Sequence, residues 1–425
     1  MRLRTAFRFL SFLALALLAA TAWAGSAEAQ GKAAPNPANP KIRAITAFIN
    51  LDRAQYQQQI TDALKMLRRA QTTFESRGYQ VQTIRIATQP FPEYTKGLTN
   101  EQAVAFFKQL DALAEQQKFA MAIGPAMLNA NDSAAQADLL AEILSNTKKL
   151  NATVVVAGEE GVRWPAIGAA ARVMKKLEES TEHSQGNFRF AAIALVPPLT
   201  PFFPAAYHTG FGHQFAIALE SANIVAAAFK DARDLGMARQ RLIDALAATA
   251  FDVEHHAGRI DQETGWAYMG IDLSPAPSGD VSIGAAIENL TTQPVGMSGT
   301  LTAAATITAA VKDVKVKQTG YTGLMLPILE DTRLAQRWSE GHISIDALLS
   351  YSAVCGTGLD TIPLPGDISA EQLSLIIGDM ASLAFKWHKP LSARLLPVLG
   401  KGWGEMTEFN DPFLVNAKLQ SLDIK

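Results

Sequence analysis

The chain alternates between short apolar runs and longer stretches in which apolar residues recur every three or four positions. Residues 42–49 are rich in β-branched side chains, as in a buried strand, whereas residues 54–77 have the spacing of an amphipathic helix. The apolar positions of that predicted helix are Ile60, Leu64, Leu67 and Phe74. The chain therefore opens with a strand followed by a helix.

The same alternation continues through the first half of the chain. The pattern predicts strands at 81–87, about 119–123, 153–157 and 188–196, and helices at about 99–116, 133–148 and 164–179. Repeated βα units favour a mainly parallel sheet, because each parallel crossover needs a helix that covers the sheet. No sharp change of composition follows Pro40. We expect residues 41–425 to form a single α/β domain, barrel-like and closed or nearly closed, with a doubly wound open sheet as the alternative.

The N-terminus has the pattern of a secretory signal peptide. Arg2, Arg4 and Arg8 precede the apolar run 9–24, which is shorter than the ~20 residues that a membrane span needs. Small-residue cleavage motifs end at Ala24 and Ala29. We expect a signal peptide over residues 1–29, a flexible lead-in over 30–40, and a periplasmic or secreted mature protein that has no membrane segment. The alternative is an uncleaved N-terminal anchor.

Composition narrows the class of protein. With 48% hydrophobic and 18% charged residues, the 425-residue chain can bury a large core. A formal charge of −2 and the absence of a clear Lys/Arg cluster argue against nucleic acid as a partner. The single cysteine, Cys355, excludes an internal disulfide and a thiolate zinc cage.

A proline-rich segment over residues 197–208 predicts an ordered loop, because its prolines exclude a helix or a central strand. The loop ends at His208, whose ordinary pKa suits proton transfer near neutrality. The alternative is a histidine that hydrogen-bonds to the loop. We expect a helix to start near Gly212, with His213 and Glu220 on one face.

Acidic residues follow apolar stretches in the second half of the chain. They are Asp272, Glu330, Asp331 and Asp360. Ligands of parallel α/β proteins bind at the carboxyl ends of strands, so these positions are candidates for chemistry. Asp331 also fits the alternative of a helix N-cap.

The stretch from Ser352 to Asp367 predicts a tight loop. Gly356 and Gly358 allow its backbone to approach a ligand closely. Asp360 and Asp367 can share a hard divalent cation, or one of them can act as a base. Cys355 is a candidate nucleophile if its thiol ionises, and otherwise a small buried apolar residue.

Two cations follow the helix predicted over residues 370–387. Lys389 and Arg394 suit the carboxylate or phosphate of a small substrate, and Arg394 can pair with it in a bidentate manner. A structural ion pair with a loop aspartate is the alternative. We expect Glu330, Asp360, Asp367 and Arg394 to converge at one rim of the barrel.

Three ordered blocks carry a family resemblance. Residues 321–331, 355–367 and 389–394 together resemble the domain-of-unknown-function 711 family, also called uncharacterised protein family 0210. Further blocks lie at residues 201–208, at Asp272 and at residues 282–288. The resemblance implies a fold similar to that of pyruvate formate-lyase-like enzymes, an α/β barrel with a central loop, without an established reaction. No glycyl-radical segment of the Arg-Val-x-Gly-Tyr type lies near the C-terminus, so we expect chemistry without a glycyl radical.

These observations lead to the hypothesis of an exported enzyme, of the lyase or hydrolase class, that acts on a small anionic substrate by acid/base or metal-assisted chemistry. The candidate catalytic residues are Asp360, Asp367, Glu330, His208 and Cys355, and the candidate substrate-binding residues are Lys389, Arg394, Asp331, Gly356 and Gly358. A divalent cation and a homo-oligomer both stay open. The alternative is a non-catalytic periplasmic solute-binding protein.

The signal-peptide hypothesis predicts that the mature protein begins at or near Gln30, because the apolar run is too short to remain as a stable span. N-terminal sequencing of the protein recovered from the periplasm checks this cleavage. Soluble cytoplasmic protein that still begins at Met1 would contradict it.

Overall fold

One large sheet gathers strands from both halves of the chain in the computed structural model, which describes residues 39–421. Its order is β8-β7-β1-β2-β3-β4-β6-β10-β9, and β5 forms a hairpin with β4. The strands are β1 (Lys41–Ile49), β2 (Ile84–Thr88), β3 (Ala120–Ala126), β4 (Leu150–Gly158), β5 (Gly161–Val162), β6 (Phe190–Ala194), β7 (Gln214–Glu220), β8 (Ala267–Asp272), β9 (Gly358–Pro365) and β10 (Leu391–Val398).

The sheet consists of two sets of strands that run in opposite directions. Strands β1, β2, β3, β4 and β6 are parallel to one another. Strand β7 joins β1 and strand β10 joins β6 in antiparallel fashion, and each brings a parallel neighbour, β8 or β9. The rim at which the first set begins is therefore the rim towards which the second set runs.

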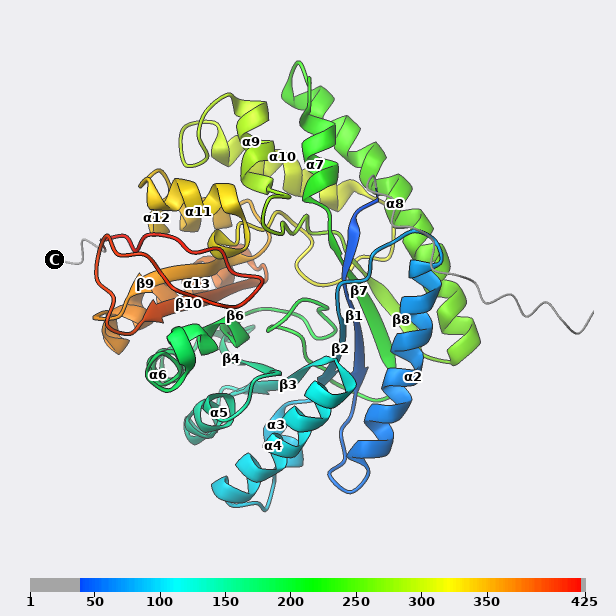
Figure 1. Ribbon diagram of the computed structural model, residues 1–425, viewed down its shortest axis with the longest axis vertical. Helices are drawn as coiled ribbons and strands as arrows, with labels where there is room; N and C mark the ends of the chain where they lie inside the picture. The colour runs from blue at the N-terminus through cyan, green and yellow to red at the C-terminus, as the bar shows by residue number, and fades with distance from the viewer. Residues whose placement is uncertain (1–38, 422–425) are drawn as a thin grey trace, which may run out of the picture.

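An irregular segment, residues 318–330, lies between the two edge strands of the sheet. Gln318 forms a parallel bridge with Ile271 of β8, and Pro327 forms a parallel bridge with Asp360 of β9. Figure 1 shows the strands arranged as a ring around the centre of the molecule. The prediction of a barrel-like α/β fold is confirmed, although the ring is completed by this segment and not by direct pairing of β8 with β9.

Helices surround the ring on the outside (Figure 1). They are α2 (Tyr56–Glu75), α3 (Phe91–Tyr94), α4 (Asn100–Gln117), α5 (Ala135–Ser145), α6 (Trp164–Ser180), η1 (Glu182–Arg189), α7 (Ala222–Phe229), α8 (Leu235–Thr264), α9 (Ile283–Thr291), α10 (Thr300–Asp313), η2 (Ile328–Glu330), α11 (Thr332–Ser339), α12 (Ile345–Ser352) and α13 (Ala370–Trp387). Helices α4 and α13 begin with capping boxes, at Thr99 and Ser369. Within residues 39–421, no helix combines the length and apolarity needed to cross a bilayer.

The helix predicted near Gly212 is wrong, because residues 214–220 form strand β7. Residues Phe215 to Glu220 are all buried, so the segment lacks the alternation that distinguishes a half-buried strand. Its Ala, Leu and Glu residues also favour a helix, and pairing with β1 overrides that preference. Glu220 therefore lies at the end of a strand.

The proline-rich segment is an ordered loop inside the ring, as predicted. The Thr46 hydroxyl donates to the carbonyl of Pro201 at 2.9 Å, and the His208 amide donates to the carbonyl of Thr88 at 2.9 Å. The Tyr207 hydroxyl donates to the carbonyl of Val196 at 2.9 Å. These bonds fix the loop against β1 and β2. The predicted signal peptide lies outside the described residues.

A close backbone contact holds the irregular segment against the loop before β9. A Cβ atom on Gly356 would lie 2.7 Å from the carbonyl carbon of Gly323. The Gly356 amide also donates to the carbonyl of Leu324 at 2.7 Å. The segment and the loop therefore need glycine where they meet.

We predict that Gly356→Ala lowers the free energy of unfolding by ~1–3 kcal/mol, because the added methyl group forces the two backbones apart. Gly258→Ala is the matched control, since Gly258 lies inside α8 with open space around its Cβ position. That change should stabilise the protein by ~0.5–1 kcal/mol. Urea unfolding measures both, and a Gly356→Ala protein as stable as the unchanged one would contradict the packing argument.

Candidate functional site

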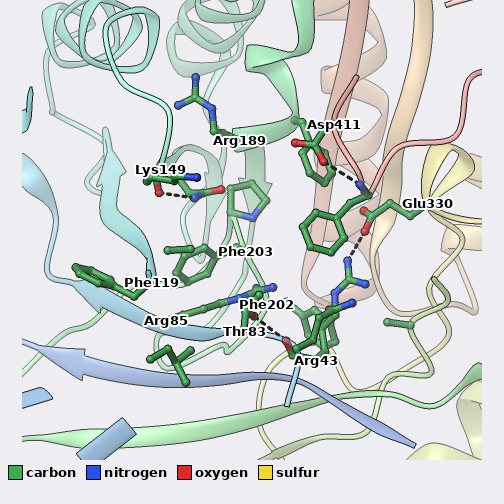
Figure 2. Close-up of a pocket in the computed structure, with 18 of the residues that line it drawn as sticks. Arg43, Thr83, Arg85, Phe119, Lys149, Arg189, Phe202, Phe203, Glu330 and Asp411 are labelled. Carbon is green, nitrogen blue, oxygen red and sulfur yellow. Dashed lines mark hydrogen bonds and ion pairs between the residues drawn. The ribbon is translucent and has the colours of Figure 1, made fainter. Parts of the chain in front are cut away.

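A cavity of about 680 Å³ lies inside the ring, at the rim where the first set of strands begins. This volume is typical of a small-molecule site. Figure 2 shows polar and aromatic side chains that face the cavity from several elements. The lining includes basic, acidic and aromatic side chains, among them Arg43, Arg85, Lys118, Phe119, Lys148, Lys149, Arg189, Phe202, Phe203, Glu330, Asp360 and Arg394.

Glu330 connects two arginines from opposite sides of the ring. Its Oε2 accepts from the Arg43 guanidinium of β1, and its Oε1 accepts from the Arg394 guanidinium of β10. Arg394 also donates through Nε to Oδ1 of Asp360, at 2.7 Å. All four side chains are almost fully buried. They form one network of charges inside the ring.

The two carboxyl groups of this network, Glu330 and Asp360, differ in their hydrogen bonding and in the direction of their pKa shifts. Both oxygens of Glu330 accept from arginines, whereas Asp360 receives a described hydrogen bond only at Oδ1. Burial opposes ionisation of Glu330, but Arg394 and Arg43 outweigh burial and hold its pKa below the ordinary value. Burial raises the pKa of Asp360, and the Glu330 carboxylate adds to that rise against the opposing effect of Arg394. Such a pair, with pKa values moved apart, is typical of acid/base sites.

Arg85 is a buried cation without an acidic partner among residues 39–421. Its side chain is on β2, only 9% of the residue is exposed, and its Nε donates to the Thr83 hydroxyl at 2.8 Å. The guanidinium carbon lies 4.7 Å from the centre of the Phe203 ring. Burial and the nearby Arg43 lower the pKa of Arg85 to about 9, against the opposing effect of the Glu330 carboxylate, which forms no ion pair with it.

A third carboxylate, Glu220, balances the cations on β1. It pairs with Lys41 at 3.0 Å and with Arg43 at 3.4 Å, and it accepts from Gln82 at 3.0 Å. Glu220, Glu330 and Asp360 thus face four cations, which are Lys41, Arg43, Arg85 and Arg394. Of these four cations, Arg85 is the one that forms no ion pair among the described residues.

The structure brings together Glu330, Asp360 and Arg394, as predicted, but it leaves Asp367 outside. Asp360 is the third residue of β9, whereas Asp367 is exposed beyond the end of that strand. At ~3.3 Å per residue, an extended strand separates them by roughly 20 Å. The predicted cation shared by Asp360 and Asp367 is therefore wrong. No group of three or more His, Cys, Asp or Glu side chains within the described part of the chain could hold a metal ion.

His208 lies away from the cavity lining. Its Nδ1 and Nε2 hydrogen-bond to the side-chain amides of Asn50 and Gln214, at 2.9 and 2.7 Å. Burial lowers its pKa. The geometry matches the alternative of a histidine that holds the loop.

Cys355 and Lys389 form a structural contact outside the cavity lining. Cys355 is buried in the main hydrophobic core. The Lys389 ammonium donates to the carbonyl of Ser352 at 2.8 Å and to the carbonyl of Cys355. Neither side chain faces the space in which Glu330 and Asp360 meet.

The remaining predicted binding residues shape the backbone. Asp331 caps α11 by accepting from the amides of Arg333 and Leu334, and it also accepts from Ile283 and Gly284 at the start of α9. This is the capping alternative. Gly356 packs on the irregular segment. A Cβ atom on Gly358, which has φ +95°, would lie 2.4 Å from the carbonyl oxygen of Ser392. These residues position the site without lining the cavity.

Sequence reasoning missed Arg43, Arg85 and Phe203. The signal available was a charged residue inside an apolar strand, in Lys41-Ile-Arg-Ala and in Thr83-Ile-Arg-Ile. Arginine is rarely buried unless it is paired, so both positions indicate a polar interior. The expectation of a site at the carboxyl ends of parallel strands fails for the first set, because the cavity lies where β1, β2 and β4 begin.

Comparisons with known proteins identify relatives along most of the chain. The family described as Uncharacterised ACR (DUF711) matches residues 36–410. A UPF0210 protein of Pyrobaculum islandicum is 32% identical over 395 residues, which cover 86% of each chain. A UPF0210 protein of Methanococcoides burtonii is 25% identical over 402 residues, which cover 87% of this chain and 88% of the relative.

Among solved structures, the chain is similar to the anaerobic ribonucleotide reductase of Thermotoga maritima, crystallised in complex with dATP and CTP. The TM-score is 0.39 at 9% identity, and the match covers 83% of this chain and 75% of that one. The match to the family and the identity to its Pyrobaculum relative confirm the resemblance found in the sequence blocks: the chain belongs to the DUF711 family, whose named relatives are UPF0210 proteins.

Proposed function

We propose that this protein is an enzyme that binds a small anion at Arg85 and transfers a proton through Asp360, inside the cavity of the barrel. The observation that carries the proposal is the buried Arg85 guanidinium, which faces a cavity of ligand size and has no acidic partner within residues 39–421. Phe202 and Phe203 supply an apolar wall beside it.

An anionic ligand supplies the charge that Arg85 lacks. A buried, unpaired charge is costly, and a carboxylate or phosphate that pairs with it offsets that cost. The Nε of Arg85 is already bonded to Thr83, so its two terminal nitrogens remain to donate to the ligand. A planar guanidinium suits such bidentate contact.

Asp360 is the group of this network best suited to proton transfer. One of its oxygens is free of described hydrogen bonds, and burial raises its pKa, so the carboxyl can take up and release a proton more readily than Glu330. Glu330 has neither property and acts as a positioning residue that holds Arg43 and Arg394. Acid/base chemistry at Asp360 is compatible with the lyase or hydrolase class.

The second candidate function is a non-catalytic solute-binding protein. The N-terminal signal pattern favours it, and export of either kind of protein remains part of this proposal. Solute-binding proteins of that type close two lobes around a hinge, whereas this cavity lies within one ring of strands. The paired carboxyls with separated pKa values also favour an enzyme.

Arg85→Met should weaken binding of a small anion by ~10–100-fold, since a hydrogen bond to a charged group contributes ~1.5–3 kcal/mol. Isothermal calorimetry with acetate, pyruvate, succinate and inorganic phosphate measures the effect. Arg172→Met is the matched control, because Arg172 is exposed on α6 and outside the cavity. An anion that binds Arg85→Met as tightly as the unchanged protein would refute the site.

Anion affinity should fall as the pH rises through the raised pKa of Asp360. The neutral carboxyl does not repel the ligand, whereas the carboxylate does. Asp360→Asn keeps the neutral form at every pH, so its affinity should lose this pH dependence. Calorimetry at pH values below about 9, where Arg85 keeps its charge, compares the two proteins. A pH dependence that persists there in Asp360→Asn would contradict the role of Asp360.

Asp360→Asn should reduce turnover of an identified substrate by ~10²–10⁴-fold, the usual contribution of a general acid or base. Cys355→Ser should change turnover little, because the buried thiol lies outside the cavity lining. Steady-state kinetics of both variants shows which substitution costs more turnover. An inactive Cys355→Ser with a fully active Asp360→Asn would overturn the assignment and favour the thiol as nucleophile.

A further inference from the structure

We propose that the mouth of the cavity holds a second anion-binding subsite, formed by Lys118, Lys148 and Lys149, and that the ligand therefore carries anionic groups at both ends. This inference rests on the proposed function, because it takes one of the two groups to bind at Arg85. It narrows the ligand from any small anion to an elongated dianion.

Basic side chains from separate elements surround the mouth. Lys118 directly follows α4, Lys148 and Lys149 precede β4, and all three line the same cavity as Arg85. Lys149 pairs with Glu115 at 2.9 Å. Neither Lys118 nor Lys148 has an acidic partner among the described residues. Arg68 and Arg189 line the cavity as well, against the acidic Glu115 and Asp411, so basic groups outnumber acidic ones there.

The fold fixes the loop that carries two of these lysines. The Asp111 carboxylate, on α4, accepts from the backbone amide of Lys148 at 2.9 Å and from that of Lys149 at 2.6 Å. The loop before β4 is thus tied to α4, whose end leads into Lys118. Side chains from the two connections are held at the same mouth.

An apolar wall separates the mouth from the deep cation. Figure 2 shows Phe203 between Lys149 on one side and Arg85 on the other, with Phe119 beside them. Phe119, Phe202 and Phe203 line this part of the cavity without charges. Arg189, on the side of Lys149, already donates to the carbonyls of Leu150 and Leu144, at 3.0 Å each. The arrangement suits an apolar or planar middle between two anionic groups.

Matched acids of increasing length test the second subsite. Hexanoate, octanoate and decanoate carry one carboxylate, whereas adipate, suberate and sebacate carry two on chains of the same length. Calorimetry at low ionic strength should find one dicarboxylate about five-fold tighter than its monoacid, the effect expected of exposed charges. The advantage should vanish near 1 M salt, where screening reaches ~3 Å. A phosphonate that replaces the outer carboxylate distinguishes a phosphate-bearing ligand from a dicarboxylic acid.

Variants assign the effect to the mouth. The double variant Lys118→Gln/Lys148→Gln should lose the preference for the dicarboxylate and keep its affinity for the monoacid. Lys65→Gln/Lys176→Gln is the matched control, since both lysines are exposed and outside the cavity lining.

The outcomes separate this inference from the proposed function. Monoacid binding that depends on Arg85, without any preference for dicarboxylates or phosphonates, would overturn the second subsite alone. A preference that survives in Lys118→Gln/Lys148→Gln would also overturn it. Monoacid binding that is unchanged in Arg85→Met would overturn the proposed function, and the second subsite with it.

Discussion

The carboxylate of Glu330 is the interaction on which both the ring and the site depend. It lies in η2, at the end of the irregular segment between β8 and β9, and it pairs with Arg43 of β1 and Arg394 of β10. Strand β1 belongs to the first set of parallel strands, and β10 belongs to the set that runs in the opposite direction. A single buried carboxylate therefore ties the segment that completes the ring to both sets, and it fixes the guanidiniums that surround the cavity.

One buried cation near this network, Arg85, forms no ion pair among the described residues. Glu330, Asp360 and Glu220 pair with Lys41, Arg43 and Arg394, whereas Arg85 contacts Phe203 and Thr83 and forms no ion pair within residues 39–421. Buried ion pairs contribute little net stability, and an unpaired buried cation is unfavourable. The protein keeps it beside an open cavity, and this is why a bound anion is central to our account. In the proposed site, the charge that binds the anion costs the ligand-free protein stability.

The sequence was sufficient for the α/β class and for three residues of the network. Asp360, Glu330 and Arg394 were recognisable because carboxylates and an arginine stand beside apolar runs. Periodicity could not identify β7, since its buried residues give no alternation. The network itself was out of reach, because Arg43 and Arg394 are far apart in the chain and meet only through the ring. Asp367 and Lys389 show the converse, as chemically suitable side chains that the fold directs elsewhere.

The central claim is that Arg85 is unpaired in the ligand-free protein and binds an anion. The stability of Arg85→Met, measured without and with an anion, tests it most directly. The account predicts that the ligand-free variant is at least as stable as the unchanged protein in thermal unfolding, because the change removes a buried positive charge from beside two other arginines. An anion that raises the Tm of the unchanged protein should leave the Tm of the variant unaltered. A ligand-free Arg85→Met that is several degrees less stable, and that the anion still stabilises, would contradict the account and make Arg85 a structural residue.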